Sequence, residues 1–411
     1  MSASLDEFAE RKLAALEQRN LRRTLIETER LGPVEVKRRG KRLISFSCND
    51  YLNLSQHQAI KAAAVEATEK YGVGAGASRL VTGNHPLFAE LEAKLAKLKG
   101  AEAACVFGSG YLANTGIIPA LAGVDDMVVV DKLSHACIFA GAKLTGGALH
   151  VFRHNDTGHL GEILAAHRAD HPRALIVTDS VFSMDGDLAP IGELADIAAE
   201  HDAWMMTDDA HSLGVVGGGR GSGTVNLPSP KRSSGFAQAG GGQGRVPLQM
   251  GTLSKAIGGY GGYLCASQSV IDLIRTRCRT LFYSTGLPPG VVAAAIAALE
   301  LIESDPDYAA LPLTKAKAFT ALLGLSEAES PIVPIVLGDS ERTLLASRLL
   351  EDEGFLVVAI RPPTVPDGKA RLRVTFTAAH KDEDIARLAE IIRTRILEAA
   401  DAEAPDAEAS A

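Results

Sequence analysis

The stretch AWMMTDDAH, residues 203–211, decides the fold that the sequence predicts. Four apolar residues are followed by polar residues that stop the run abruptly. A run this short and apolar suits a strand that is buried on both faces of a sheet. The same pattern recurs at four other places, and a helical pattern follows each run. The other apolar runs are residues 103–107, 127–130, 174–177 and 246–250.

Strands that alternate with helices predict an α/β fold with a mostly parallel, doubly wound sheet. Ligands of such folds bind beyond the carboxyl ends of the strands. The polar residues that close the runs are therefore expected around a single pocket, although they are far apart in the sequence. These residues are Ser109, His135, Ser183, Asp208, His211 and Lys255.

The pattern changes after residue 287. An apolar helix over 291–302 is followed by predicted strands at 331–337, 355–360 and 370–376 and by helices at 341–353 and 383–399. The last strand alternates, with Leu372, Val374 and Phe376 on one face and Arg371, Arg373 and Thr375 on the other. These elements predict a small α+β domain over 288–399, after a large domain over 47–287.

The two ends of the chain differ from these domains. Residues 5–30 have apolar side chains at helical spacing and predict a charged amphipathic helix, within an N-terminal arm and first strand over 1–46. Residues 400–411 are rich in Ala, Asp and Glu and are expected to be disordered. Residues 217–244 are dense in Gly and Ser, which predicts a flexible surface loop.

The composition excludes several classes of protein. The 411 residues carry a net charge of −8, so no basic excess exists to bind nucleic acid. The N-terminus is polar, unlike a signal peptide, and no apolar run is long enough to cross a bilayer. The five cysteines are scattered without a C-x-x-C pair, which favours reduced thiols over disulfides or a metal site. We therefore expect a cytoplasmic protein without a metal.

Lys255 lies in the phrase GTLSKA, residues 251–256, just after a predicted buried strand. An amine there suits a Schiff base with pyridoxal phosphate (PLP), and the hydroxyls of Thr252 and Ser254 suit the phosphate. A solvated lysine explains this short phrase equally well. The phrase alone leaves both interpretations open.

Asp208 and His211 follow another predicted strand. PLP withdraws electrons best while its ring nitrogen stays protonated, and a buried carboxylate enforces that state. His211 is spaced to reach the ring hydroxyl. A helix-capping aspartate beside a structural histidine is the simpler explanation and is favoured when the pair is taken alone. No third ligand at suitable spacing supports a metal site.

Weaker signals come from GSGY, residues 108–111, and from His135. A glycine turn that opens a helix presents N–H groups to a phosphate, and a histidine can lie flat on a cofactor ring. Both patterns also occur often by chance. The glycines of residues 72–76 follow no strand and indicate a tight turn, not a nucleotide site.

In their order, these phrases resemble those of the α-oxoamine synthases, PLP enzymes that condense an amino acid with an acyl thioester and release CO2. The resemblance runs from about residue 47 to residue 399. It is carried by CNDYL (48–52), GAGASR (74–79), DKLSHA (131–136), VFSMDGD (181–187), DDAH (208–211) and GTLSK (251–255).

The resemblance implies an aspartate-aminotransferase-like fold (PLP fold type I), PLP as the cofactor, and a homodimer with the site at the interface. It implies that Lys255 binds PLP and moves the α-proton of the amino acid, that Asp208 pairs with the ring nitrogen, and that His211 bonds the ring oxygen. His135 is implied to stack on the ring. The other implied contacts are Ser183, Thr252, Gly110 and Tyr111 for the cofactor, Arg373 and Asn49 for the α-carboxylate, and Arg22 and Thr364 for the acyl chain.

Within the family, residues 360–366 look most like those of members that join L-alanine to a pimeloyl thioester, on coenzyme A or acyl carrier protein. The implied products are 8-amino-7-oxononanoate, CO2 and free thiol, in biotin biosynthesis. Ser78 and Leu80 replace the Thr and Asn of 5-aminolevulinate synthase, which disfavours a succinyl donor. A glycine-using 2-amino-3-ketobutyrate ligase is the alternative. A PLP-binding subunit without turnover is disfavoured, because Lys255, Asp208 and His211 occur together. The Gly- and Ser-rich stretch over residues 217–244 is longer than the corresponding stretch in the family.

Overall fold

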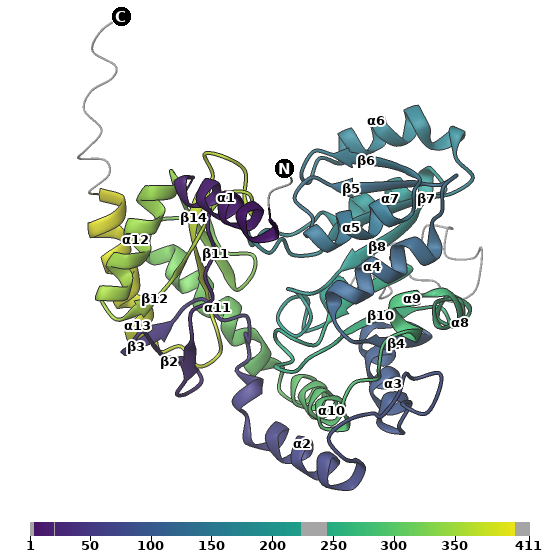
Figure 1. The fold of residues 1–411 in the computed structure, drawn as a ribbon, viewed down its shortest axis with the longest axis horizontal. Coiled ribbons are helices and arrows are strands. Elements are labelled where there is room, and N and C mark those ends of the chain that lie inside the picture. Colours follow the sequence, from purple (N-terminus) through teal and green to yellow (C-terminus); the bar gives the residue numbers. More distant parts are fainter. Residues whose placement is uncertain (1–3, 20, 223–244, 399–411) are drawn as a thin grey trace, which may run out of the picture. The chain divides into compact units, whose positions relative to one another are not determined.

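The computed structural model describes residues 4–19, 21–222 and 245–398 (Figure 1). The chain divides into two compact units: the large unit is residues 49–313, and the small unit joins residues 1–48 to residues 314–411. The predicted boundary after residue 287 differs from this division, because α10 (Pro289–Ser304) packs against α2 (Gln58–Tyr71) and α3 (Leu87–Lys99). The predicted tail and most of the predicted loop 217–244 lie outside the described residues.

A seven-stranded sheet forms the centre of the large unit. Its order is β4 (Ala103–Phe107), β10 (Gly262–Ala266), β9 (Leu248–Thr252), β8 (Trp204–Asp208), β7 (Ala174–Asp179), β5 (Met127–Asp131) and β6 (Ala148–Phe152). β10 pairs antiparallel with both of its neighbours, and the other pairs are parallel. The mostly parallel α/β sheet is therefore confirmed. Because they point the same way, β4, β5, β7, β8 and β9 end at the same edge.

Helices cover both faces of this sheet (Figure 1). Along β5, Val128 and Val130 face one core while Met127 and Val129 face the other. The first core includes side chains of α4 (Gly110–Leu121), α5 (Ala136–Leu144), α8 (Gln268–Arg277) and α9 (Arg279–Phe282). The second includes side chains of α6 (Thr157–His167) and α7 (Ile191–Glu200). Burial on both faces explains why the strands appear as apolar runs.

The small unit contains two sheets. One has the order β1 (Thr28–Arg30), β2 (Glu35–Arg38), β3 (Lys41–Ser45) and β12 (Phe355–Leu356); the other has the order β11 (Ile332–Gly338), β14 (Ala370–Thr375) and β13 (Val358–Ile360). Its core takes side chains from α11 (Pro306–Leu322), α12 (Ser340–Asp352) and α13 (Asp382–Ile392). Leu372, Val374 and Phe376 lie in this core as predicted, although the polar face of β14 is buried as well.

Two predicted elements of the small unit are wrong in part. The helix predicted over residues 5–30 ends early: α1 spans Leu5–Gln18, and residues 28–30 pair with β2 instead. The strand predicted over residues 355–360 is split between the two sheets, since β12 pairs with β3 and β13 pairs with β14. Among the described residues, no helix combines the length and apolar character needed to cross a membrane.

Candidate active site

The parallel strands bring most of the predicted site residues to one edge of the large sheet. Asp208 is the last residue of β8, and Lys255 follows β9 by three residues. His135 caps the helix after β5, Ser183 follows β7, and Gly110 begins α4 directly after β4. Because these strands point the same way, the residues that follow them lie at one edge of the sheet.

A short chain of hydrogen bonds links Lys255 to the interior. Its Nζ lies 2.5 Å from Nε2 of His211, and Nδ1 of the same ring lies 2.6 Å from the hydroxyl of Tyr51. His211 and Tyr51 are buried, whereas Lys255 is half-buried. The amine therefore lies next to a histidine ring whose other nitrogen is held by a buried hydroxyl.

Asp208 is buried and held by two N–H donors. Nδ2 of Asn114 donates to its Oδ2 at 2.7 Å, and the backbone N–H of Ala210 donates to its Oδ1 at 2.9 Å. Burial raises the pKa of Asp179 well above its usual range, and the nearby negative charge of Asp208 raises it further. Asp208 is thus a fixed carboxylate at the edge where a ligand is expected.

The N-terminus of α4 lies close to Thr252. A Cβ on Gly110 would lie 3.3 Å from Cβ of Thr252, so the glycine permits this approach. The Thr252 hydroxyl is 2.8 Å from that of Ser254 and donates to the carbonyl of Gly261 at 2.7 Å. A helix N-terminus with adjacent hydroxyls is a common anion site.

His135 is oriented by the start of α5. Its backbone N–H donates to Oδ2 of Asp179 at 3.0 Å, and its Nδ1 accepts from the backbone N–H of Cys137 at 3.3 Å. The Cys137 thiol lies 2.8 Å from the same nitrogen, and burial raises the pKa of that thiol to about 12. Desolvation lowers the pKa of His135, with Asp208 opposing the shift and Lys255 adding to it. A neutral ring with Nδ1 as acceptor follows, which leaves Nε2–H as the donor.

The remaining predicted residues divide between the units. Asn49 belongs to the large unit and accepts from the Tyr51 hydroxyl at 3.3 Å. Arg373 is buried in the small unit. Arg22 is exposed and pairs with Glu17, while its neighbour Arg23 donates to Thr364 at 2.8 Å. Tyr111 is exposed beside Gly110.

Several residues of the site went unpredicted. Asn114 holds Asp208, Tyr51 holds His211, and Cys137 holds His135. Asn114 had a usable signal, since it is an amide one turn into a mostly apolar helix. The contact of Tyr51 with His211 joins residues 160 positions apart and leaves no local pattern. Cys137 is only two residues from His135, but its apolar neighbours in α5 give no sign of a role in the site.

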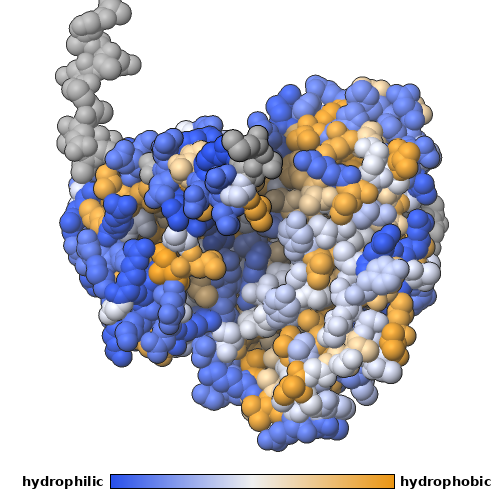
Figure 2. Space-filling view, viewed as in Figure 1, coloured by the Kyte–Doolittle hydropathy of each residue, from blue (hydrophilic) through white to orange (hydrophobic). Residues whose placement is uncertain are grey.

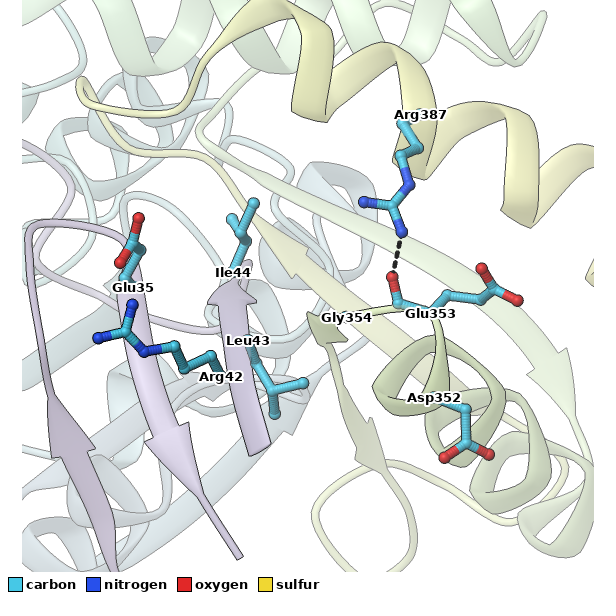
Figure 3. Close-up of a pocket in the computed structure, with 8 residues that line it drawn as sticks. All are labelled: Glu35, Arg42, Leu43, Ile44, Asp352, Glu353, Gly354 and Arg387. Atoms are coloured by element: carbon cyan, nitrogen blue, oxygen red, sulfur yellow. Dashed lines mark hydrogen bonds between the residues drawn. The ribbon is translucent and has the colours of Figure 1, made fainter. Parts of the chain in front are cut away.

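A separate pocket of about 410 Å³ lies in the small unit (Figure 3). It opens between β3, the end of α12 and α13, and Arg387 reaches toward the carbonyl of Glu353 there. None of the predicted site residues lines this pocket. We therefore place the candidate active site at the edge of the large sheet.

The groups at that edge fit PLP: an amine, a fixed carboxylate, a helix N-terminus with hydroxyls, and a ring that can stack. The family described as aminotransferase class I and II matches residues 41–392. The 8-amino-7-oxononanoate synthase of Beijerinckia indica is 59% identical over 389 residues, which cover 95% of this chain and 97% of that protein. The enzyme of the same name from Methylocella silvestris is 61% identical over 360 residues, 88% and 99% of the two chains.

A solved structure agrees with these sequence relatives. Serine palmitoyltransferase from S. paucimobilis, with bound PLP-myriocin aldimine, has a TM-score of 0.84 and 29% identity, covering 95% of this chain and 98% of that one. The chain therefore belongs to the class I and II aminotransferase family, in which its relatives include 8-amino-7-oxononanoate synthases.

Proposed function

We propose that the chain is a PLP-dependent acyltransferase that joins L-alanine to a pimeloyl thioester and yields 8-amino-7-oxononanoate, CO2 and free thiol, in biotin biosynthesis. Relatives at 59% and 61% identity carry the name of this activity. The observation that carries the proposal is the linked set Tyr51, His211 and Lys255 at the edge where Asp208 is fixed.

In this proposal Lys255 would hold PLP covalently, and Asp208 would stabilise positive charge on its ring nitrogen. The N-terminus of α4 and the hydroxyl of Thr252 would bind the phosphate, and Ser183 would donate a hydrogen bond to an oxygen of the cofactor. PLP, when bound, withdraws electrons from the α-carbon of the amino acid, so that a proton or CO2 can leave.

Lys255 also moves the α-proton at its Nζ. An amine acts as a base only after it loses its own proton, and Nε2 of His211 lies 2.5 Å away to share that proton. Tyr51 orients the His211 ring from the other side. Nε2–H of His135 is the donor left for the carbonyl oxygen of the thioester, where negative charge develops.

Arg373 and Asn49 are proposed to bind the α-carboxylate of alanine, because a guanidinium pairs well with a carboxylate. Arg22 and Thr364 are proposed at the acyl chain. The contact between Arg23 and Thr364 adds Arg23 as a further candidate there. The acyl carrier is coenzyme A or acyl carrier protein.

We also propose a cytoplasmic homodimer. Figure 2 shows hydrophobic residues exposed among polar ones on the visible face of the large unit. Leu80, Val81 and Tyr283 are exposed in two segments that a bridge between Ser78 and Thr285 joins. Exposed apolar side chains in adjacent segments are typical of an interface. Sedimentation that gives only the 43.2 kDa mass of one chain at micromolar concentration would exclude the dimer.

The substrate is tested by titrating the purified holoenzyme with L-alanine and with glycine, while its visible absorption is followed. We expect alanine to shift the band at lower concentration, and product formation from alanine with pimeloyl-coenzyme A or pimeloyl-acyl carrier protein to be detected by mass spectrometry. Tighter binding of glycine, with no product from alanine on either carrier, would contradict the proposal and favour a glycine-using member of the family.

A further inference from the structure

We propose that His154 is a positioning residue, which holds in place the two segments that carry His135 and Ser183. The inference rests on the proposed function, because it is that function that gives His135 and Ser183 their roles. His154 follows β6, and no cofactor contact is expected of it. Its ring lies between two carboxylates that belong to the two segments.

The first carboxylate is that of Asp131, the last residue of β5. Its Oδ1 lies 3.0 Å from Nδ1 of His154 and accepts the backbone N–H of Leu133 at 2.7 Å. Its Oδ2 accepts the backbone N–H of Asn155 at 2.8 Å. Asp131 is fully buried and begins the turn that ends at His135. The His154 ring thus anchors the start of the turn that places His135.

The second carboxylate is that of Asp187. Its Oδ2 lies 2.7 Å from Nε2 of His154 and 3.1 Å from the side-chain nitrogen of Asn155. The carbonyl of Asp187 accepts the backbone N–H of Phe182 at 3.1 Å, which closes the turn that contains Ser183. The His154 ring therefore fixes the end of the turn that places Ser183.

The ring has little freedom between these groups. It meets the ring of buried Phe182 edge-on, with the centroids 4.4 Å apart. Both ring nitrogens face carboxylate oxygens, so the ring donates twice and carries a positive charge. Although burial disfavours that charge, the hydrogen bonds and charges of Asp131 and Asp187 raise the pKa of His154 to about 10. Charge-assisted bonds of this kind are among the stronger ones in proteins.

The test compares His154→Gln with Arg173→Gln, a matched control. Arg173 pairs with buried Asp126 at 2.8 Å, just before β5, at the opposite end of that strand from Asp131. Each substitution removes a positive partner of a buried carboxylate at one end of β5. Only the carboxylate that His154 contacts, that of Asp131, lies at the end of β5 that leads to His135.

Hydrogen exchange of the cofactor-free protein is measured first, and the dissociation constant of added PLP second. In His154→Gln we expect exchange of backbone amides in segments 131–135 and 182–187 to rise by about tenfold, and PLP binding to weaken by a similar factor. Arg173→Gln should leave both measurements as in the unsubstituted protein. Unchanged exchange in His154→Gln, or an equal rise in both variants, would overturn the proposal.

Asp187→Asn provides a second variant in case His154→Gln does not fold. Asp187 is the more exposed of the two carboxylates, and its substitution removes one of the two carboxylate contacts of the His154 ring. We expect faster exchange in segment 182–187 while segment 131–135 stays protected; a uniform rise would contradict the positioning role. If the unsubstituted protein binds no PLP, the proposed function fails, and the exchange results still decide the role of His154.

Discussion

Lys99 is a fully buried lysine that pairs with the residue next to Asp208. Its Nζ pairs with Oδ2 of Asp209 at 2.5 Å and also donates to the carbonyl of Arg220. Asp209 accepts from the hydroxyl of Ser222 at 2.6 Å and from that of Ser212 at 3.1 Å. Burial opposes the charge of Asp209, yet Lys99 and the hydroxyls of Ser222 and Ser180 lower its pKa. The residue next to Asp208 is therefore held as an ion pair inside the protein.

Removing one partner of a buried ion pair leaves an uncompensated charge, which is strongly destabilising. We expect Lys99→Met to lower the free energy of unfolding by about 3–5 kcal/mol, as measured by urea denaturation of the cofactor-free protein. Lys94→Met is the control on the same helix, because Lys94 pairs with exposed Glu300. That control should cost no more than about 1 kcal/mol. Equally small losses in both variants would show that the buried pair contributes little.

Among single residues, the sequence pointed to side chains with distinctive chemistry. It did not point to the buried residues that hold those side chains in place. Lys255, Asp208, His211 and His135 each follow an apolar run, and that position marks them. Lys99 lies in the charged pattern KLAKLKG, where nothing distinguishes it from Lys97, which is exposed. Its burial depends on Asp209, which is 110 residues away in the sequence. Long-range pairs of this kind cannot be found from local patterns.

Among the elements of the small unit, β3 is tied to the turn after β14 by a buried histidine. His380 stacks on Phe46 with ring centroids 4.0 Å apart. Its Nδ1 accepts the backbone N–H of Thr377 at 2.9 Å, and its Nε2 donates to the carbonyl of Ser45 at 3.0 Å. Burial lowers the pKa of His380 from 6.5 to about 4. The ring is therefore neutral in the folded protein.

This shift has a definite sign. Below pH 6.5 the unfolded chain binds a proton at His380, whereas the folded protein binds one there only below about pH 4. Lowering the pH between these values therefore favours unfolding. We expect the stability advantage of the unsubstituted protein over His380→Gln to shrink by about 3 kcal/mol between pH 7 and pH 4. Urea denaturation at several pH values measures it, and other groups titrate alike in both proteins. An advantage that does not change with pH would contradict the buried neutral ring.

The elements that the sequence predicted best are those buried on both sides. The apolar runs at 103–107, 127–130 and 174–177 became β4, β5 and β7 with shifts of no more than two residues. The helix predicted over residues 5–30 failed in its second half, because pairing of β1 with β2 overrides helical spacing. β10 was missed, since an antiparallel strand between β4 and β9 has no βαβ pattern to mark it.

At the scale of the whole molecule, the predicted order of a large α/β part before a small α+β part was close to the structure, with one difference of connectivity. The small unit takes residues from both ends of the chain, and the division falls within α11. Neither end carries a pattern that reveals its partner, because the contact is between strands β3 and β12, more than 300 residues apart. The family match over residues 41–392 covers parts of both units.

The central claim is that Lys255 is the residue that binds PLP. Borohydride reduction of the purified holoenzyme, followed by proteolysis and mass spectrometry, tests it directly. We predict a reduced pyridoxyl phosphate group on the Lys255 side chain, and none in Lys255→Ala treated in the same way. A label on another lysine, or no label on protein that was supplied with PLP, would contradict the account.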